Sequence, residues 1–91
     1  MTITAAQCRA ARGLLGWNQA DMAAEASINK WTIQRFEGGR PVSRNSIQHM
    51  RRALESGGVL FILGDDDADE GVRLVKGAGG KSAVEGAETD D

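Results

Sequence analysis

The stretch Leu15–Arg40, LGWNQADMAAEASINKWTIQRFEGGR, decides the fold, because its start and stop signals predict two short helices joined by a tight turn. Asn18 is suited to cap the first helix, and Asp21, three residues later, is placed to bond back to the Asn18 amide, as in a capping box. We expect this helix to run to about Ala26 and the turn to be made by Ser27-Ile28.

The second helix of the stretch is predicted over Lys30–Glu37. Asn29 is its expected cap, and Gly38-Gly39 should end it in the left-handed conformation that glycine tolerates. Ile33 and Phe36 mark its buried side. The opposite side carries four residues that are free to meet a partner: Lys30, Trp31, Gln34 and Arg35. Two such helices form a helix-turn-helix pattern, which predicts DNA binding.

A further helix is predicted before this pair. Thr4 and Gln7 form a capping box, and the helix they open should run to about Leu15 and close at Gly16. Its inward stripe is Cys8, Ala11 and Leu15.

Another helix is predicted after Pro41. It should open at Asn45, with Gln48 three residues on, and end at Gly57-Gly58. Its apolar stripe is Ile47, Met50, Ala53 and Leu54. Four helices in residues 1–58 form one small domain, and because a core of this size supplies only a few kcal/mol, we expect a homodimer.

Residues 59–76 change from helical to strand periodicity. Val59–Leu63 is a β-prone apolar run, Gly64–Gly71 is an acidic connector, and Val72–Lys76 alternates as a half-buried strand. We predict a β-hairpin that packs on the helices or pairs with a second copy, since an isolated hairpin is marginal. The connector lacks the ligand spacing of an EF-hand, so no metal is expected. The acidic tail, 77–91, has the composition of a disordered segment.

The charge is divided along the chain. Residues 1–58 hold eight Lys and Arg against four acids, whereas the remainder holds three against nine, for a total of −2. A basic helical part fits nucleic-acid binding despite the acidic total, because the local field governs attraction to phosphate. No apolar run approaches the roughly 20 residues of a membrane helix and no signal-peptide pattern opens the chain, so we expect a cytoplasmic protein.

Catalysis is not expected. The single cysteine, Cys8, excludes an intramolecular disulfide and lies on a buried stripe, where it acts as a small apolar residue. His49 has no paired carboxylate nearby in the sequence. The segment 77–82 ends in Gly-Lys-Ser, but Val75 stands where a phosphate-binding loop requires its first glycine. We therefore predict neither an enzyme nor a bound cofactor.

Three segments together carry a family resemblance: NQADMA at 18–23, IQRFEGGR at 33–40 and RRAL at 51–54. With them, the first 58 residues resemble the lambda-repressor-like helix-turn-helix domains of the XRE family. Small regulators of this type often continue into G-V-x-F-I and G-V-R-L strands, which resemble 58–62 and 71–74. The resemblance thus covers about the first 76 residues and implies a mainly α fold with a C-terminal hairpin.

The resemblance also implies roles for scaffold residues. Arg12 matches the arginine that forms a structural ion pair with the glutamate ending the recognition helix, here Glu37. Asn18 and Gln19 match positions that hold a phosphate and brace the recognition helix.

The recognition helix and the loop after it match the positions that meet DNA. Those facing base edges in the major groove are Lys30, Trp31, Gln34 and Arg35. Asn29 and Thr32 match positions nearer the DNA backbone, and Arg40 and Arg44 match the loop that clamps phosphate.

The chemistry of the base-facing residues fits this role in part. Lys30 and Arg35 suit guanine, and Gln34 suits adenine. Trp31 departs from the pattern because indole has one donor and no acceptor. It could pack on a thymine methyl, form a protein-binding hot spot, or fold down onto the preceding helix. Trp17 matches a mostly buried position and is expected in the core.

Two functional hypotheses follow. The first is a dimeric, sequence-specific DNA-binding transcriptional regulator, a repressor or autoregulator, whose partners are double-stranded DNA and a second copy of the chain. The second is a helix-turn-helix domain diverted to protein binding, such as an anti-activator that sequesters another regulatory protein through Trp31. An antitoxin would combine both activities.

Overall fold

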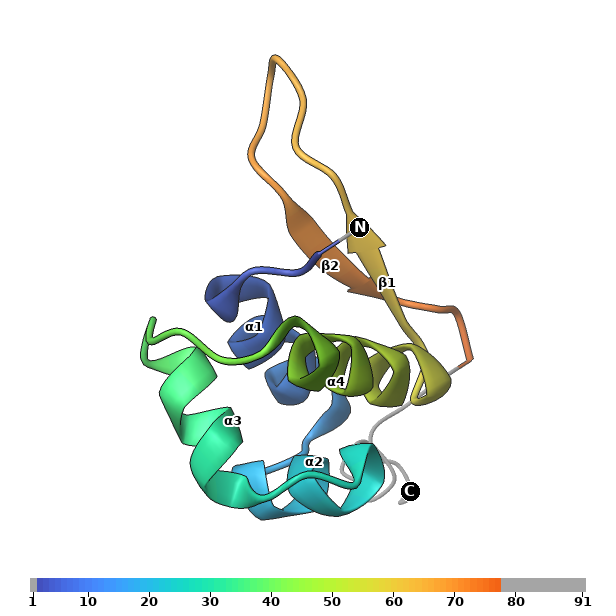
Figure 1. Ribbon diagram of the computed structural model, residues 1–91. Helices are drawn as coiled ribbons and strands as arrows, with labels where there is room; N and C mark the ends of the chain where they lie inside the picture. The colour runs from blue at the N-terminus through green and yellow to red at the C-terminus, as the bar shows by residue number, and fades with distance from the viewer. Residues whose placement is uncertain (1, 78–91) are drawn as a thin grey trace.

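The computed structural model describes residues 2–77, and within this range it contains four helices followed by two strands (Figure 1). They are α1 (Ala5–Leu15), α2 (Gln19–Ala26), α3 (Lys30–Glu37), α4 (Arg44–Ser56), β1 (Val59–Ile62) and β2 (Gly71–Leu74). The prediction of a mainly helical chain that ends in a hairpin is confirmed for these residues. The predicted disordered tail, 77–91, lies outside the described part except for Gly77.

The first two helices begin at the predicted caps. Thr4 and Gln7 form a complete capping box at α1, with Gln7 N–H donating to Thr4 Oγ1 at 3.1 Å and Thr4 N–H donating to Gln7 Oε1 at 2.9 Å. Asn18 and Asp21 form the same arrangement at α2. Each box satisfies N–H groups that the helix itself leaves unpaired, so local sequence fixes both helix starts.

The start of α4 differs from the prediction. Ser43 caps this helix, with its hydroxyl accepting from Ser46 N–H at 3.0 Å, whereas Asn45 lies exposed in the first turn. The serine two positions earlier already supplies the capping oxygen, so the helix begins at Arg44. Arg44 therefore belongs to α4 rather than to the loop before it.

The end of α3 also corrects a detail of the prediction. Gly38 has a φ of −85° and its N–H still bonds to Gln34 O at 3.0 Å, so it continues the helical turn. Gly39 alone of this pair is left-handed, with a φ of 84°. The left-handed residue that ends the helical turn is thus Gly39 rather than Gly38.

The core lies where the four helices meet the hairpin. Its fully buried large side chains are Ile3, Leu15, Met22, Ile33, Met50 and Leu54. Trp17, predicted to be mostly buried, is only partly buried and packs on the edge of this core, beside Gly57. A Cβ on Gly57 would lie 2.9 Å from Leu15 Cδ1 and 3.1 Å from the Trp17 ring, so a larger residue there would displace the Leu15 or Trp17 side chain.

The hairpin is antiparallel, with Val59 opposite Leu74 and Ile62 opposite Gly71. The strands are shorter than predicted, and β2 begins at Gly71 rather than at Val72. The inward side chains of the two strands, Val59, Phe61, Val72 and Leu74, pack against the helices. We expected the hairpin either to pack on the helices or to pair with a second copy, and in the structure it packs on the helices of its own chain.

A buried side chain of α1 fastens the hairpin. Gln7 is only 3 % exposed, and its Nε2 donates to Ile62 O at 3.3 Å and to Gly71 O at 3.0 Å. These two carbonyls belong to the last residue pair before the connector, so Gln7 caps α1 with one end of its amide and holds the hairpin with the other. Among residues 2–77, no helix combines the length and the apolar character that a membrane crossing requires.

Candidate nucleic-acid interface

The turn between α2 and α3 sets the direction of α3. Ser27 adopts a left-handed conformation with a φ of 59°, and its N–H bonds to Ala24 O at 3.4 Å. Ile28 N–H bonds to Ala23 O at 3.1 Å, and the partly buried Ile28 side chain packs against the core. The last carbonyls of α2 are thus satisfied by the turn itself, which holds α3 in a fixed orientation.

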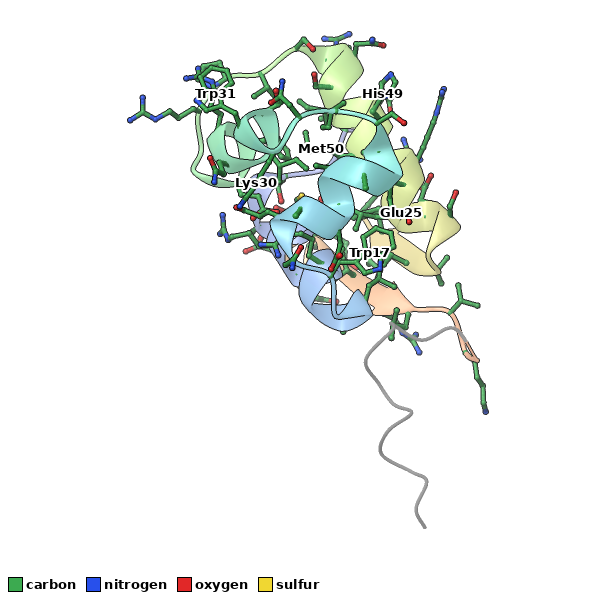
Figure 2. All side chains as sticks on the ribbon, turned by 90° about the horizontal axis from the view of Figure 1, so that it is seen from below. Trp17, Glu25, Lys30, Trp31, His49 and Met50 are labelled. Carbon is green, nitrogen blue, oxygen red and sulfur yellow. The ribbon has the colours of Figure 1, made fainter. Side chains whose placement is uncertain are left out.

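Helix α3 has one buried and one open side. Ile33 is fully buried and Phe36 is 8 % exposed. The open side holds the residues predicted to meet DNA: Lys30, Trp31, Gln34 and Arg35. Lys30, Trp31 and Gln34 are exposed, and Figure 2 shows Trp31 directed outward while Met50 lies in the interior. The structure therefore presents the predicted residues together on a single accessible surface, which we call the outer surface of α3.

Trp31 stands out from this surface and does not fold onto α2. Its side chain is 63 % exposed, and the Arg35 guanidinium lies over the ring, 5.0 Å from the ring centroid. Arg35 Nη2 also donates to Pro41 O at 3.1 Å. The two contacts orient Arg35 in advance, and a cation stacked on indole is stabilised by the ring quadrupole. The alternative in which Trp31 folds down onto the preceding helix is therefore wrong.

The last residue of α3 is held by donors from two other helices, α1 and α2. Glu37 is 6 % exposed, and its carboxylate accepts from Arg12 Nε and Nη2, each at 2.7 Å. Gln19 Nε2 donates at 3.1 Å and Cys8 Sγ at 3.3 Å, while Arg9 Nη1 donates to the Glu37 backbone carbonyl. This set of five residues, the Glu37 network, joins α1, α2 and α3 where α3 ends.

The network shifts the protonation equilibria of its members. Burial favours the neutral acid, but the hydrogen bonds from Arg12, Gln19 and Cys8 outweigh it, so the pKa of Glu37 is lowered overall. The hydrogen bond to Glu37 raises the pKa of Arg12. Burial, together with the Glu37 charge and hydrogen bond, raises the pKa of Cys8 far above its usual range. The ion pair is thus fully charged at neutral pH, and the thiol stays protonated and unreactive.

Sequence reasoning placed Cys8 in the core, and its side chain is indeed fully buried. It missed that the thiol donates a hydrogen bond to Glu37, and it missed Arg9 as a partner of the α3 carbonyl. A signal was present, because Cys8 lies four residues before Arg12 and therefore on the same face of α1.

The polar residues at the helix starts have defined local roles. Asn18 Oδ1 accepts from Asp21 N–H at 2.7 Å, and Asn29 Oδ1 accepts from both the backbone and the hydroxyl of Thr32, at 2.8 and 3.0 Å. Capping uses the carbonyl oxygen of each amide, whereas a contact to phosphate would use its NH₂ group. Gln19 differs, because its NH₂ group already donates to Glu37 and braces α3.

Two arginines flank the segment that follows α3. Arg40 and Arg44 are both exposed, and Arg40 N–H bonds to Arg35 O at 2.9 Å. Arg44 is the first residue of α4, so it stands at a helix N-terminus, where backbone N–H groups without an intrahelical partner favour an anion such as phosphate.

No family model matches the chain, and no curated protein matches it.

The single histidine of the chain, His49, lies away from α3. His49 Nδ1 is 3.2 Å from Ala26 O and borders an open cavity of about 300 Å³ between α2 and α4. Glu25 and Arg52 line the same cavity, and Figure 2 shows Glu25 and His49 apart from Trp31. This hollow is separate from the outer surface of α3.

Proposed function

We propose that this protein is a sequence-specific DNA-binding transcriptional regulator, with a lambda-repressor-like helix-turn-helix whose helix α3 enters the major groove. The observation that carries the proposal is the contrast within α3. The Glu37 network and the core side chains hold one side, whereas cationic, amide and aromatic side chains stand together on the other.

The chemistry of this surface supports direct readout of bases. Lys30 suits guanine O6 and N7, and Gln34 suits the N6 and N7 of adenine, each contact being worth about 1–3 kcal/mol of discrimination. Arg35 can bind guanine by giving up its bond to Pro41. Asn18, Asn29, Thr32, Arg40 and Arg44 then meet the DNA backbone and set the register of the protein on the duplex.

The test is the affinity of the full chain for a fluorescent duplex from the region upstream of its own gene, compared with a shuffled duplex at two salt concentrations. We expect dissociation constants on the order of 10⁻⁸–10⁻¹¹ M for the specific site and clear weakening by salt. Lys30→Ala should weaken specific binding by about 5- to 150-fold, the range that corresponds to one base contact.

A matched control separates base contact from the general loss of charge. Arg52→Ala also removes one exposed cation, but from the cavity between α2 and α4. It should change affinity far less than Lys30→Ala. Equal effects of the two variants, or equal affinity for the shuffled duplex, would contradict specific readout by α3.

A second candidate function is favoured by Trp31 alone. A tryptophan that is 63 % exposed, with a guanidinium stacked on it, is typical of a protein-binding hot spot. In this case the chain is an anti-activator that sequesters another regulator, or an antitoxin. Trp31→Ala would then abolish capture of that partner, whereas the wild-type chain would bind the upstream duplex no better than the shuffled one.

A further inference from the structure

The outer face of β1 is apolar and uncovered. On this face, Leu60 is 52 % exposed and Ile62 is 40 % exposed. Leu63, which follows the strand and by alternation belongs to the opposite face, is 68 % exposed. On β2, the residue opposite Leu60 is the exposed Arg73. A charged side chain on an edge strand protects the sheet from pairing with another chain. Strand β2 carries such a charge at Arg73, whereas β1 has no charged residue.

The backbone of β1 is also open on one side. Val75 N–H donates to Gly58 O, so Gly58 and Val75 form a hydrogen-bonded pair of the antiparallel ladder. Hydrogen-bonded and non-hydrogen-bonded pairs alternate along such a ladder, so the backbone N–H and C=O groups of Leu60 and Ile62 also point toward β2. Those of Val59 and Phe61 point away from β2. Within residues 2–77, no backbone partner outside the strand pair is found for these two residues.

We propose that a second copy of this chain pairs with β1, antiparallel and about a two-fold axis at Phe61, to form a continuous four-stranded sheet. Phe61 then pairs with Phe61 of the second copy, and Val59 pairs with its Leu63. On the outer face, Leu60 of one copy lies opposite Ile62 of the other, so each protomer covers the exposed aliphatic side chains of its partner.

Charge selects this orientation. The connector carries five carboxylates: Asp65, Asp66, Asp67, Asp69 and Glu70. Parallel pairing would bring two connectors together, whereas antiparallel pairing separates them and directs each toward the base of the other hairpin. That base holds the exposed Lys76. The arrangement is therefore self-complementary in both shape and charge.

The other available occupant, the C-terminal part of the chain, does not have the right composition. Residues 78–91 contain one bulky aliphatic residue, Val84, and four carboxylates. Such a segment cannot match the exposed aliphatic side chains of Leu60 and Ile62, and it would add negative charge beside the connector. A second β1 strand supplies both the backbone groups and the aliphatic side chains.

The pairing deepens the proposed function, because a two-fold dimer supplies the two copies of α3 that a palindromic site requires. Figure 1 shows the connector as the part of the hairpin farthest from the helices and α3 on a different side of the molecule. Dimerisation through β1 therefore leaves the outer surface of α3 open. Because self-association is measured without DNA, its outcome is independent of the outcome of the DNA-binding experiment.

The test is sedimentation equilibrium of the full chain, compared with the double variant Leu60→Lys/Ile62→Lys. We expect the wild type to have the mass of two chains, and the variant to associate about 100-fold or more weakly, because lysines would face lysines across the axis. Leu14→Lys is the matched control, since Leu14 on α1 is exposed to the same 40 % as Ile62. It should remain dimeric, and far-UV circular dichroism should be unchanged in all variants.

A cross-linking experiment tests the register. In a mixture of Leu60→Cys and Ile62→Cys chains, the two thiols oppose each other and should form a covalent dimer under mild oxidation, while either variant alone should cross-link several-fold more slowly. The native Cys8 is fully buried and does not compete. A monomeric wild type, a lysine variant that dimerises normally, or equal cross-linking in all three samples would overturn the proposed pairing.

Discussion

The two sides of α3 differ in how completely their polar groups are satisfied. On the inner side, the Glu37 carboxylate receives hydrogen bonds from Arg12, Gln19 and Cys8 and is almost fully buried. On the outer side, Lys30 and Gln34 are exposed, and each keeps a hydrogen-bonding head in solvent.

The difference separates positioning from contact. Burying a carboxylate is costly unless donors surround it, so the inner network tolerates little change and holds α3 in one orientation. The outer side chains contribute little to folding and are free to be chosen for what they bind. Changes on the inner side should therefore affect stability, and changes on the outer side should affect recognition.

The largest effect on stability is expected from removal of the Glu37 carboxylate on the inner side of α3. Glu37→Ala leaves Arg12 without its partner, and since the side chains of the pair are 4 % and 19 % exposed, we expect a loss of about 3–5 kcal/mol in the free energy of unfolding. Urea denaturation followed by circular dichroism measures it.

The control for this variant is the exposed ion pair of α4. Glu55 accepts from Arg51 Nε at 3.0 Å, with 40 % and 25 % of the respective side chains exposed. Glu55→Ala should cost only about 0–1 kcal/mol, because water screens an exposed pair. A similar cost for the two variants would show that the Glu37 network does not hold the scaffold.

The pH dependence of stability should show a smaller effect from the same group. The pKa of Glu37 is lower in the folded chain than in the unfolded chain, so its stabilising contribution is complete above the unfolded value and is lost as the pH falls through the folded value. The stability difference between wild type and Glu37→Gln should stay constant above about pH 5 and shrink below about pH 4.

The comparison with Glu37→Gln is necessary because another carboxylate titrates in the same range. Backbone N–H groups of Asp67 and Ala68 lower the pKa of the exposed Asp65, and this group is present in both chains. Its contribution therefore cancels in the difference. A difference that is independent of pH down to pH 2 would contradict the assignment to Glu37.

The smallest effect on stability is expected on the outer side. Trp31→Ala removes a side chain that is 63 % exposed, and it should change the free energy of unfolding by no more than about 0.5 kcal/mol. It should nevertheless change binding, either to DNA or to a partner protein. A loss of more than about 2 kcal/mol in thermal or urea denaturation would place Trp31 in the scaffold instead.

Local signals in the sequence were sufficient for most of the helices. The capping boxes at Thr4 and Asn18 and the cap at Asn29 predicted three helix starts correctly, because the capping oxygen and its N–H partner lie within three residues of each other. The predicted start of α4 was wrong because two polar residues, Ser43 and Asn45, are both suited to be the N-cap. The chain on either side of them decides which one caps the helix, and in the structure it is Ser43.

What the sequence determined by itself is therefore what depends on near neighbours: the helices and their caps, the alternating hairpin, and the outer side of α3. The tertiary structure decided the contacts between residues far apart in the chain. Gln7 bonds to carbonyls 55 and 64 residues away, and Cys8 bonds to Glu37, 29 residues away. No periodicity encodes such pairs, because they form only when packing brings α1 against both the hairpin and the end of α3.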